Sequence, residues 1–130
     1  MLADTPSLLI TDDDPHFREA LRDAFQPRGF RTLLASDGEE ALRIVRSREV
    51  HLLLLDMHMP KLTGLETVRQ VKRVKGLLPC ILMSARLDPT IVEQAQREQV
   101  FSVLPKPVTL YELTGTVLRA LERAYNWHAR

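Results

Sequence analysis

The chain has 130 residues, of which 45% are hydrophobic and 27% charged, and its formal net charge is +1. This balance is ordinary for one globular domain and leaves little room for a second. The near-neutral charge gives no argument for binding nucleic acid or membranes, and apolar runs such as 52–55 are far too short to cross a bilayer. The single Cys80 excludes an internal disulfide and fits a cytoplasmic location.

Short apolar stretches alternate with amphipathic ones along the chain. The apolar stretches, which we expect to be strands, are 8–11, 31–34, 52–55, 81–83 and 101–104. The first, third and fourth are almost continuously apolar, which is typical of parallel strands covered by helices on both faces.

The stretches between the expected strands have helical patterns. One apolar stripe at helical spacing comprises Phe17, Ala20, Leu21, Ala24 and Phe25. A second stripe comprises Leu110, Leu113, Val117 and Leu121. Asp14 and Asp88 each precede a proline and are expected to cap helices, whereas Gly29 is expected to end the first helix.

Five strand–helix units in strict alternation predict an α/β fold. Parallel strands joined by right-handed helical crossovers form a doubly wound sheet with helices on both faces. The chain shows no internal repeat, low-complexity tract or linker. We therefore expect a single domain over residues 1–130, with its core at about 7–125.

Polar residues close four of the expected strands. Asp12 and Asp13 follow the first, Asp56 the third, Ser84 the fourth and Lys106 the fifth. Open α/β sheets bind ligands at the carboxyl ends of their strands, so these side chains are expected to converge at one edge. A core does not need charged residues there, and their convergence predicts a functional site.

Three carboxylates brought together repel one another, so positive charge must offset them. Lys106 supplies one charge, and a hard divalent cation such as Mg²⁺ would supply the rest. One carboxylate could then attack a phosphorus atom whose oxygens are held by metal, lysine and hydroxyl. Taken singly, Asp12 and Asp13 are explained equally well as turn or capping residues, and Asp56 as the end of a strand.

Four segments, in this order, resemble the receiver domains of bacterial two-component response regulators. They are Leu9–Pro15, Leu54–Pro60 followed by Gly64, Leu82–Ala85 and Leu104–Pro107. The resemblance covers nearly the whole chain and implies a flavodoxin-like sheet in the order 2-1-3-4-5. It also implies a phosphorylation-activated switch that catalyses only its own phosphotransfer and dephosphorylation, rather than a metabolic enzyme.

The resemblance implies roles for the acidic residues. Asp56 would accept a phosphoryl group from the histidine of a kinase or phosphotransfer protein. Asp13 and Asp56 would bind Mg²⁺ directly, with Mn²⁺ as a possible substitute. Asp12 would act mainly through water, and the backbone carbonyl of His58 would complete the protein ligands.

The resemblance also implies a switch. Lys106 would contact one phosphoryl oxygen, and Ser84 would move inward to bond another. This move would reshape the face formed by the fourth helix, fifth strand and fifth helix, which is expected to bind a partner or a second copy of the chain. The strand-five aromatic that accompanies the move in the family is replaced by Val103, and the usual small pair before that strand by Gln99-Val100, so the coupling and the turn are expected to differ.

Two positions near the expected site invite a hypothesis about rates. His58 follows Asp56 by two residues, and Arg86 follows Ser84 by two. Both would border the path of an attacking water and tune the lifetime of the phosphoryl group, and Ala85 would leave that path open. The alternative is that both are ordinary residues at the rim of the site.

Three other classes of protein share part of this pattern. A haloacid-dehalogenase-like phosphohydrolase would need a carboxylate where His58 stands. An FMN carrier would need a phosphate-binding loop where Asp12 and Asp13 stand. A receiver that acts only as a binding module, without phosphorylation, is the third. The sequence identifies neither the kinase nor the output.

Overall fold

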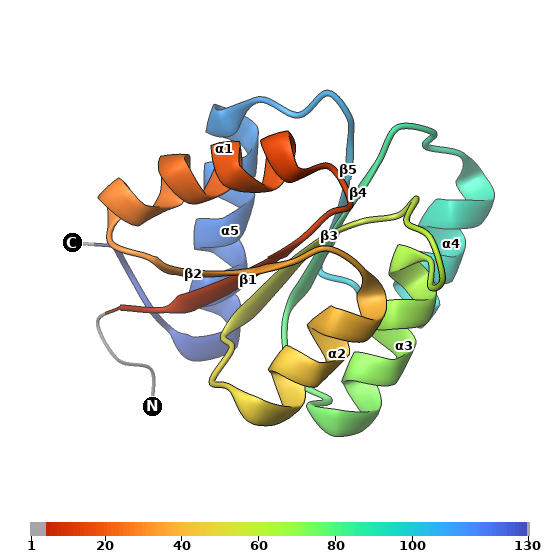
Figure 1. Ribbon diagram of the computed structural model, residues 1–130, viewed down its shortest axis with the longest axis horizontal. Helices are drawn as coiled ribbons and strands as arrows, with labels where there is room; N and C mark the ends of the chain where they lie inside the picture. The colour runs from red at the N-terminus through yellow and green to blue at the C-terminus, as the bar shows by residue number, and fades with distance from the viewer. Residues whose placement is uncertain (1–4, 130) are drawn as a thin grey trace.

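The computed structural model describes residues 5–129, which form five parallel strands and five α-helices in alternation (Figure 1). The strands are β1 (Ser7–Thr11), β2 (Arg31–Ala35), β3 (Leu52–Asp56), β4 (Cys80–Ser84) and β5 (Ser102–Pro105). The helices are α1 (Pro15–Phe25), α2 (Gly38–Ser47), α3 (Gly64–Val74), α4 (Pro89–Arg97) and α5 (Leu110–Tyr125). The expected domain of 1–130 therefore includes residues 1–4 and 130, which lie outside the described residues.

The strands lie in the order β2-β1-β3-β4-β5, and every neighbouring pair is parallel. Helices α1 and α5 cover one face of the sheet, and α2, α3 and α4 cover the other. This arrangement confirms the predicted doubly wound fold and the strand order that the resemblance implied.

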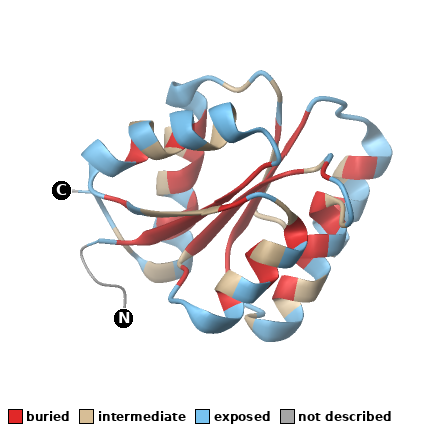
Figure 2. Ribbon diagram, in the orientation of Figure 1, coloured by how far each residue is buried: buried red, intermediate tan, exposed pale blue. Residues whose placement is uncertain are grey.

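Strands β1, β3 and β4 are buried along their whole length (Figure 2). Their side chains alternate between two apolar clusters. Leu53 and Leu82 pack with α2, α3 and α4, whereas Leu54 and Met83 pack with α1 and α5. The continuous apolar runs seen in the sequence therefore reflect burial on both faces of a parallel sheet.

The predicted helix caps are confirmed. The Asp14 carboxylate accepts the backbone N–H of His16 at 2.9 Å, and Asp88 accepts that of Ile91 at 2.9 Å. Helix α1 ends at Phe25, and a short 3-10 helix, Gln26–Arg28, follows it directly. Gly29 therefore ends this 3-10 helix rather than α1 itself. Gly29 has a φ of 92°, which glycine adopts without the strain that a Cβ would bring.

Gly64 lets α3 begin directly beside the end of β3. Its backbone N–H donates to the carbonyl of Met57 at 2.9 Å. A Cβ at this position would lie 2.6 Å from the carbonyl oxygen of Asp56, too close for any side chain. The loop that follows Asp56 is therefore closed against the strand by backbone packing.

Helix α4 ends in a Schellman turn. The N–H of Val100 donates to the carbonyl of Ala95 at 3.0 Å, and that of Gln99 to Gln96 at 3.0 Å. Gln99 occupies the left-handed position of this turn, with a φ of 59°. The pair expected to alter the turn thus retains a motif that usually contains glycine.

The chain after α5 packs back onto the domain. The Trp127 ring centroid lies 5.7 Å from that of Phe30, and the hydroxyl of Tyr125 donates to the carbonyl of His51 at 2.8 Å. His51 in turn accepts the N–H of Ser7 on Nδ1 at 2.8 Å. Within residues 5–129, none of the helices, including this last one, has the length and apolarity needed to span a membrane.

Candidate functional site

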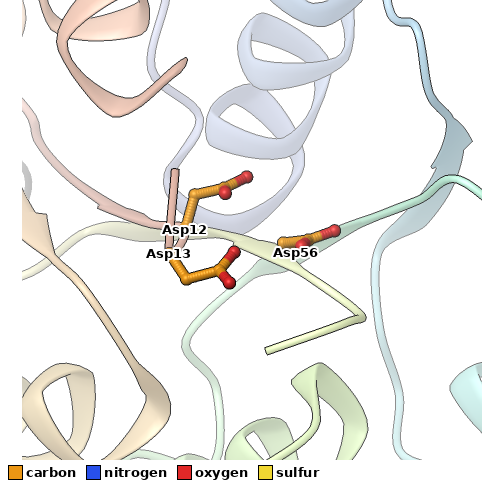
Figure 3. A group of neighbouring side chains, drawn as sticks. All are labelled: Asp12, Asp13 and Asp56. Carbon is orange, nitrogen blue, oxygen red and sulfur yellow. The ribbon is translucent and has the colours of Figure 1, made fainter. Parts of the chain in front are cut away.

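Three aspartates gather at the carboxyl edge of the sheet. Residues 12 and 13 follow β1, and Asp56 ends the neighbouring β3 (Figure 3). Each of Asp12, Asp13 and Asp56 offers a carboxylate oxygen, and these oxygens all lie within 4.8 Å of one another. Asp12 and Asp56 are buried, while Asp13 is exposed. The predicted convergence of the acidic residues is therefore present in the structure.

Lys106 provides the positive charge at this edge. Its Nζ lies 2.7 Å from Oδ2 of Asp12 and 3.3 Å from Oδ1 of Asp56. The backbone N–H of Lys106 donates to the carbonyl of Ser84 at 2.8 Å, which fixes the start of the loop beyond β5 against the end of β4. The peptide bond between Lys106 and Pro107 is cis.

Burial and charge shift the titration of these groups in linked ways. Burial raises the pKa of Asp56; the charge of Lys106 lowers it, that of Asp12 raises it, and the net direction is upward. Burial alone would lower the pKa of Lys106, but its hydrogen bond to Asp12 and the charges of both aspartates raise it overall. The ammonium group therefore stays charged, and the cluster carries less positive than negative charge.

Ser84 ends β4 with its hydroxyl turned into a local network. Its Oγ donates to the carbonyl of Arg86 at 2.7 Å and accepts the N–H of the same residue at 3.2 Å. The Nε2 of His58 lies 3.2 Å from Oγ. Ser84 is fully buried, whereas His58, Ala85 and Arg86 are exposed around it.

Val103 lies where the resemblance leads one to expect an aromatic residue. It pairs with Leu82 of β4 and packs, half-buried, with the cluster under α2, α3 and α4. Phe101 packs with the cluster on the opposite face of the sheet. Phe101, which directly precedes β5, is therefore on the wrong face to replace the missing ring.

Two residues of α1 reach the site without having been predicted to do so. Nζ of Lys106 lies 4.4 Å from the centroid of the Phe17 ring, and Nη1 of Arg18 donates to the carbonyl of Asp12 at 2.7 Å. Phe17 belongs to the apolar stripe that predicted α1, and no role was predicted for Arg18. The only local signal was their position in the first turn after the Asp14 cap.

A doubly wound sheet with acidic side chains and a lysine gathered at its carboxyl edge has its polar cluster where open α/β folds bind ligands. The family model of the response regulator receiver domain matches residues 8–118. The chain therefore belongs to the response regulator receiver domains, the signal-receiving modules of two-component systems.

Two curated relatives illustrate the match. The response regulator MprA of Mycobacterium ulcerans (strain Agy99) is 35% identical over 116 residues, covering 89% of this chain and 50% of that protein. A response regulator receiver protein of Anaeromyxobacter sp. (strain Fw109-5) is 34% identical over 102 residues, covering 78% of this chain and 43% of that protein. The chain thus spans about half the length of the curated relatives it matches.

Solved structures share the fold. A CheY-like receiver domain protein from Methanospirillum hungatei JF-1 has a TM-score of 0.90 at 17% identity, covering 94% of this chain and 98% of that one. The response regulator TrrA of Thermotoga maritima, solved in complex with Mg²⁺-BeF, has a TM-score of 0.82 at 28% identity, covering 90% and 100%.

Proposed function

We propose that the chain is a phosphorylation-activated switch whose acceptor is Asp56. The observation that carries the proposal is the geometry of one carboxylate. Oδ1 of Asp56 lies 3.3 Å from the Lys106 ammonium, and the residue shares an acidic cluster with Asp12 and Asp13. Phosphoryl transfer needs positioning and neutralisation of charge more than elaborate covalent chemistry, and this cluster supplies both.

The donor would be the phosphohistidine of a kinase or a phosphotransfer protein. A carboxylate oxygen of Asp56 forms the new bond to phosphorus, the phosphorus–nitrogen bond breaks, and its electron pair stays on the imidazole. The ammonium group of Lys106 offsets the negative charge of the phosphoryl oxygens. The hydroxyl of Ser84 turns toward one of these oxygens once the group is in place.

The donor set at the site fits a hard divalent cation. Asp12, Asp13 and Asp56 offer only oxygen atoms, and the oxygens lie close enough together to share one ion. We expect Asp13 and Asp56 to bind Mg²⁺ directly, Asp12 through water, and the carbonyl of His58 to complete the set. When bound, Mg²⁺ supplies further positive charge, because Lys106 alone does not neutralise the three carboxylates.

The experiment that tests this proposal is intact mass after incubation with acetyl phosphate, with and without Mg²⁺. We expect one phosphoryl adduct, formed only with Mg²⁺ and lost in Asp56→Asn. Asp14→Asn is the matched control, because Asp14 is an exposed helix cap that asparagine replaces well. An adduct that persists in Asp56→Asn would move the acceptor elsewhere, and no adduct in the parent would favour a module that binds without phosphorylation.

We further propose that His58 and Arg86 tune the lifetime of the phosphoryl group. Both side chains are exposed beside the buried Ser84, where an attacking water would pass. The rate at which the phosphoryl mass is lost should change when either is replaced by alanine, and should not change in Arg73→Ala, an exposed position on α3. Equal rates in all three variants would reduce His58 and Arg86 to rim residues.

The output would be read from the face formed by α4, β5 and α5. We expect this face to change on phosphorylation and to bind a partner or a second copy of the chain. Sedimentation with and without beryllofluoride and Mg²⁺ tests self-association, and an unchanged mass would argue against the dimer. With Val103 and no aromatic ring on that face of β5, the change is expected to depend mainly on Ser84.

A further inference from the structure

The hydroxyl of Ser84 has no hydrogen-bonding capacity left. A serine hydroxyl has one proton to donate and two lone pairs that accept. The proton points to the carbonyl of Arg86 at 2.7 Å, and the N–H of Arg86 approaches Oγ at 3.2 Å. The remaining lone pair faces Nε2 of His58 at 3.2 Å. Arg86 and His58 therefore both hold the hydroxyl in place.

These contacts determine which nitrogen of His58 carries the proton. A carbonyl oxygen has no proton, so the short contact between Ser84 and Arg86 must use the hydroxyl proton. The contact between Oγ and Nε2 can then be a hydrogen bond only if Nε2 is the donor. His58 thus donates to Ser84 from the loop that follows Asp56, across a separation of 26 residues.

We propose that His58 is a positioning residue that holds the Ser84 hydroxyl in its resting orientation by donating Nε2–H to Oγ. This inference rests on the proposed function, in which the hydroxyl turns to a phosphoryl oxygen. That oxygen is an acceptor, so Ser84 must withdraw its proton from Arg86, and we take the same rotation of the side chain to break the contact of Oγ with Nε2 of His58. His58 therefore opposes the turn, and the loop beside the acceptor controls the residue that responds to it.

The restraint lowers the apparent affinity for a phosphoryl mimic. If only the turned hydroxyl contributes to binding, the measured affinity scales with the fraction of molecules in which Ser84 has turned. Removing one hydrogen bond of ordinary net strength raises that fraction roughly threefold to tenfold. The effect must vanish when Ser84 has no hydroxyl to hold.

The first experiment is nitrogen NMR of the histidine rings in the metal-free protein. At about pH 8 the ring of His58 should carry a proton on Nε2, the nitrogen that faces Oγ of Ser84. The His58→Gln variant assigns the signal, and Ser84→Ala should weaken the preference. A ring protonated mainly on Nδ1 would overturn the proposal.

The second experiment is a double-mutant cycle on the binding of beryllofluoride with Mg²⁺. His58→Leu removes the donor and should tighten binding roughly threefold to tenfold, whereas His58→Gln keeps a side-chain N–H and should stay near the parent. In the Ser84→Ala background, His58→Leu should have no effect. Tightening that persists without the hydroxyl, or no tightening at all, would overturn the proposal.

The two experiments separate this inference from the proposed function. A parent that forms no phosphoryl adduct and binds no beryllofluoride would refute the proposed function. The ring NMR would still decide whether His58 donates to Ser84, because it uses neither metal nor phosphoryl group.

Discussion

The turn that ends α4 holds Gln99 in a conformation that glycine adopts more easily. Its φ of 59° brings the Cβ close to the following carbonyl, which costs a residue with a side chain about 1–2 kcal/mol. Glycine avoids this cost but has more conformational entropy to lose on folding, about 0.5–1 kcal/mol. Gln99→Gly should therefore raise the free energy of unfolding by about 0.5–1 kcal/mol.

The same chemical change inside the helix should have the opposite sign. Gln94 is exposed in α4, as Gln99 is after it, and neither side chain makes a hydrogen bond with another described residue. Gln94→Gly should lower the free energy of unfolding by about 0.5–1 kcal/mol, because glycine is a poor helix former. Because both variants replace an exposed glutamine with glycine, the difference between them reports the effect of the backbone conformation at the two positions.

Urea unfolding followed by circular dichroism measures both changes. With an m-value of about 2 kcal/mol/M, the midpoint should move by roughly 0.25–0.5 M, upward for Gln99→Gly and downward for Gln94→Gly. The m-value itself should stay constant. If both variants lowered the midpoint equally, the left-handed strain at Gln99 would be refuted.

Three other predictions concern buried or half-buried polar groups. Asp56→Asn should stabilise the metal-free protein at neutral pH, because burial raises the pKa of this carboxyl and its ionised form is costly. In urea titrations this gain should shrink as the pH falls through the folded pKa toward the unfolded value of 3.8, and a gain independent of pH would contradict the cause. Burial lowers the pKa of His51. The stability that its neutral ring contributes should be complete well above pH 6.5, and it should be lost as the pH falls through 6.5 and then through the pKa of the folded state. His51→Asn should flatten this part of the pH profile, and an unchanged profile would assign the loss to another group. Thr11→Val should raise stability by about 1 kcal/mol, because its buried Oγ1 has no hydrogen-bond partner among the described residues. Thermal unfolding at or below the parent's midpoint would show that the hydroxyl is satisfied.

The fold was predictable because its signals are local. Continuous apolar runs place the five strands to within a residue of their bounds, the helical stripes place α1 and α5, and the caps Asp14 and Asp88 mark where α1 and α4 begin. The convergence of Asp12, Asp56 and Lys106 followed from strand ends in a parallel sheet, and the structure places them in contact.

Contacts that depend on how elements pack were not predictable from the same signals. Arg18 bonds the backbone of Asp12 only because α1 turns back over the end of β1. The contact between His58 and Ser84 joins the loop after β3 to the end of β4 and depends on a rotamer at each end. The left-handed backbone at Gln99 was missed in detail, although the altered composition of the turn was noticed, because the strain is a property of the chain's path rather than of the residue.

The alternation of side chains along the strands also determines on which face of the sheet each residue of the site lies. Ser84 comes two residues after Leu82 on β4 and so lies on the face covered by α2, α3 and α4. Asp56 comes two residues after Leu54 on β3 and so lies on the face covered by α1 and α5. Exchanging one apolar residue for another leaves this alternation intact. Deleting a single residue from β4 would invert it and turn the hydroxyl away from its loop. The lengths of the strands, more than the identity of their leucines, thus constrain how this domain can diverge.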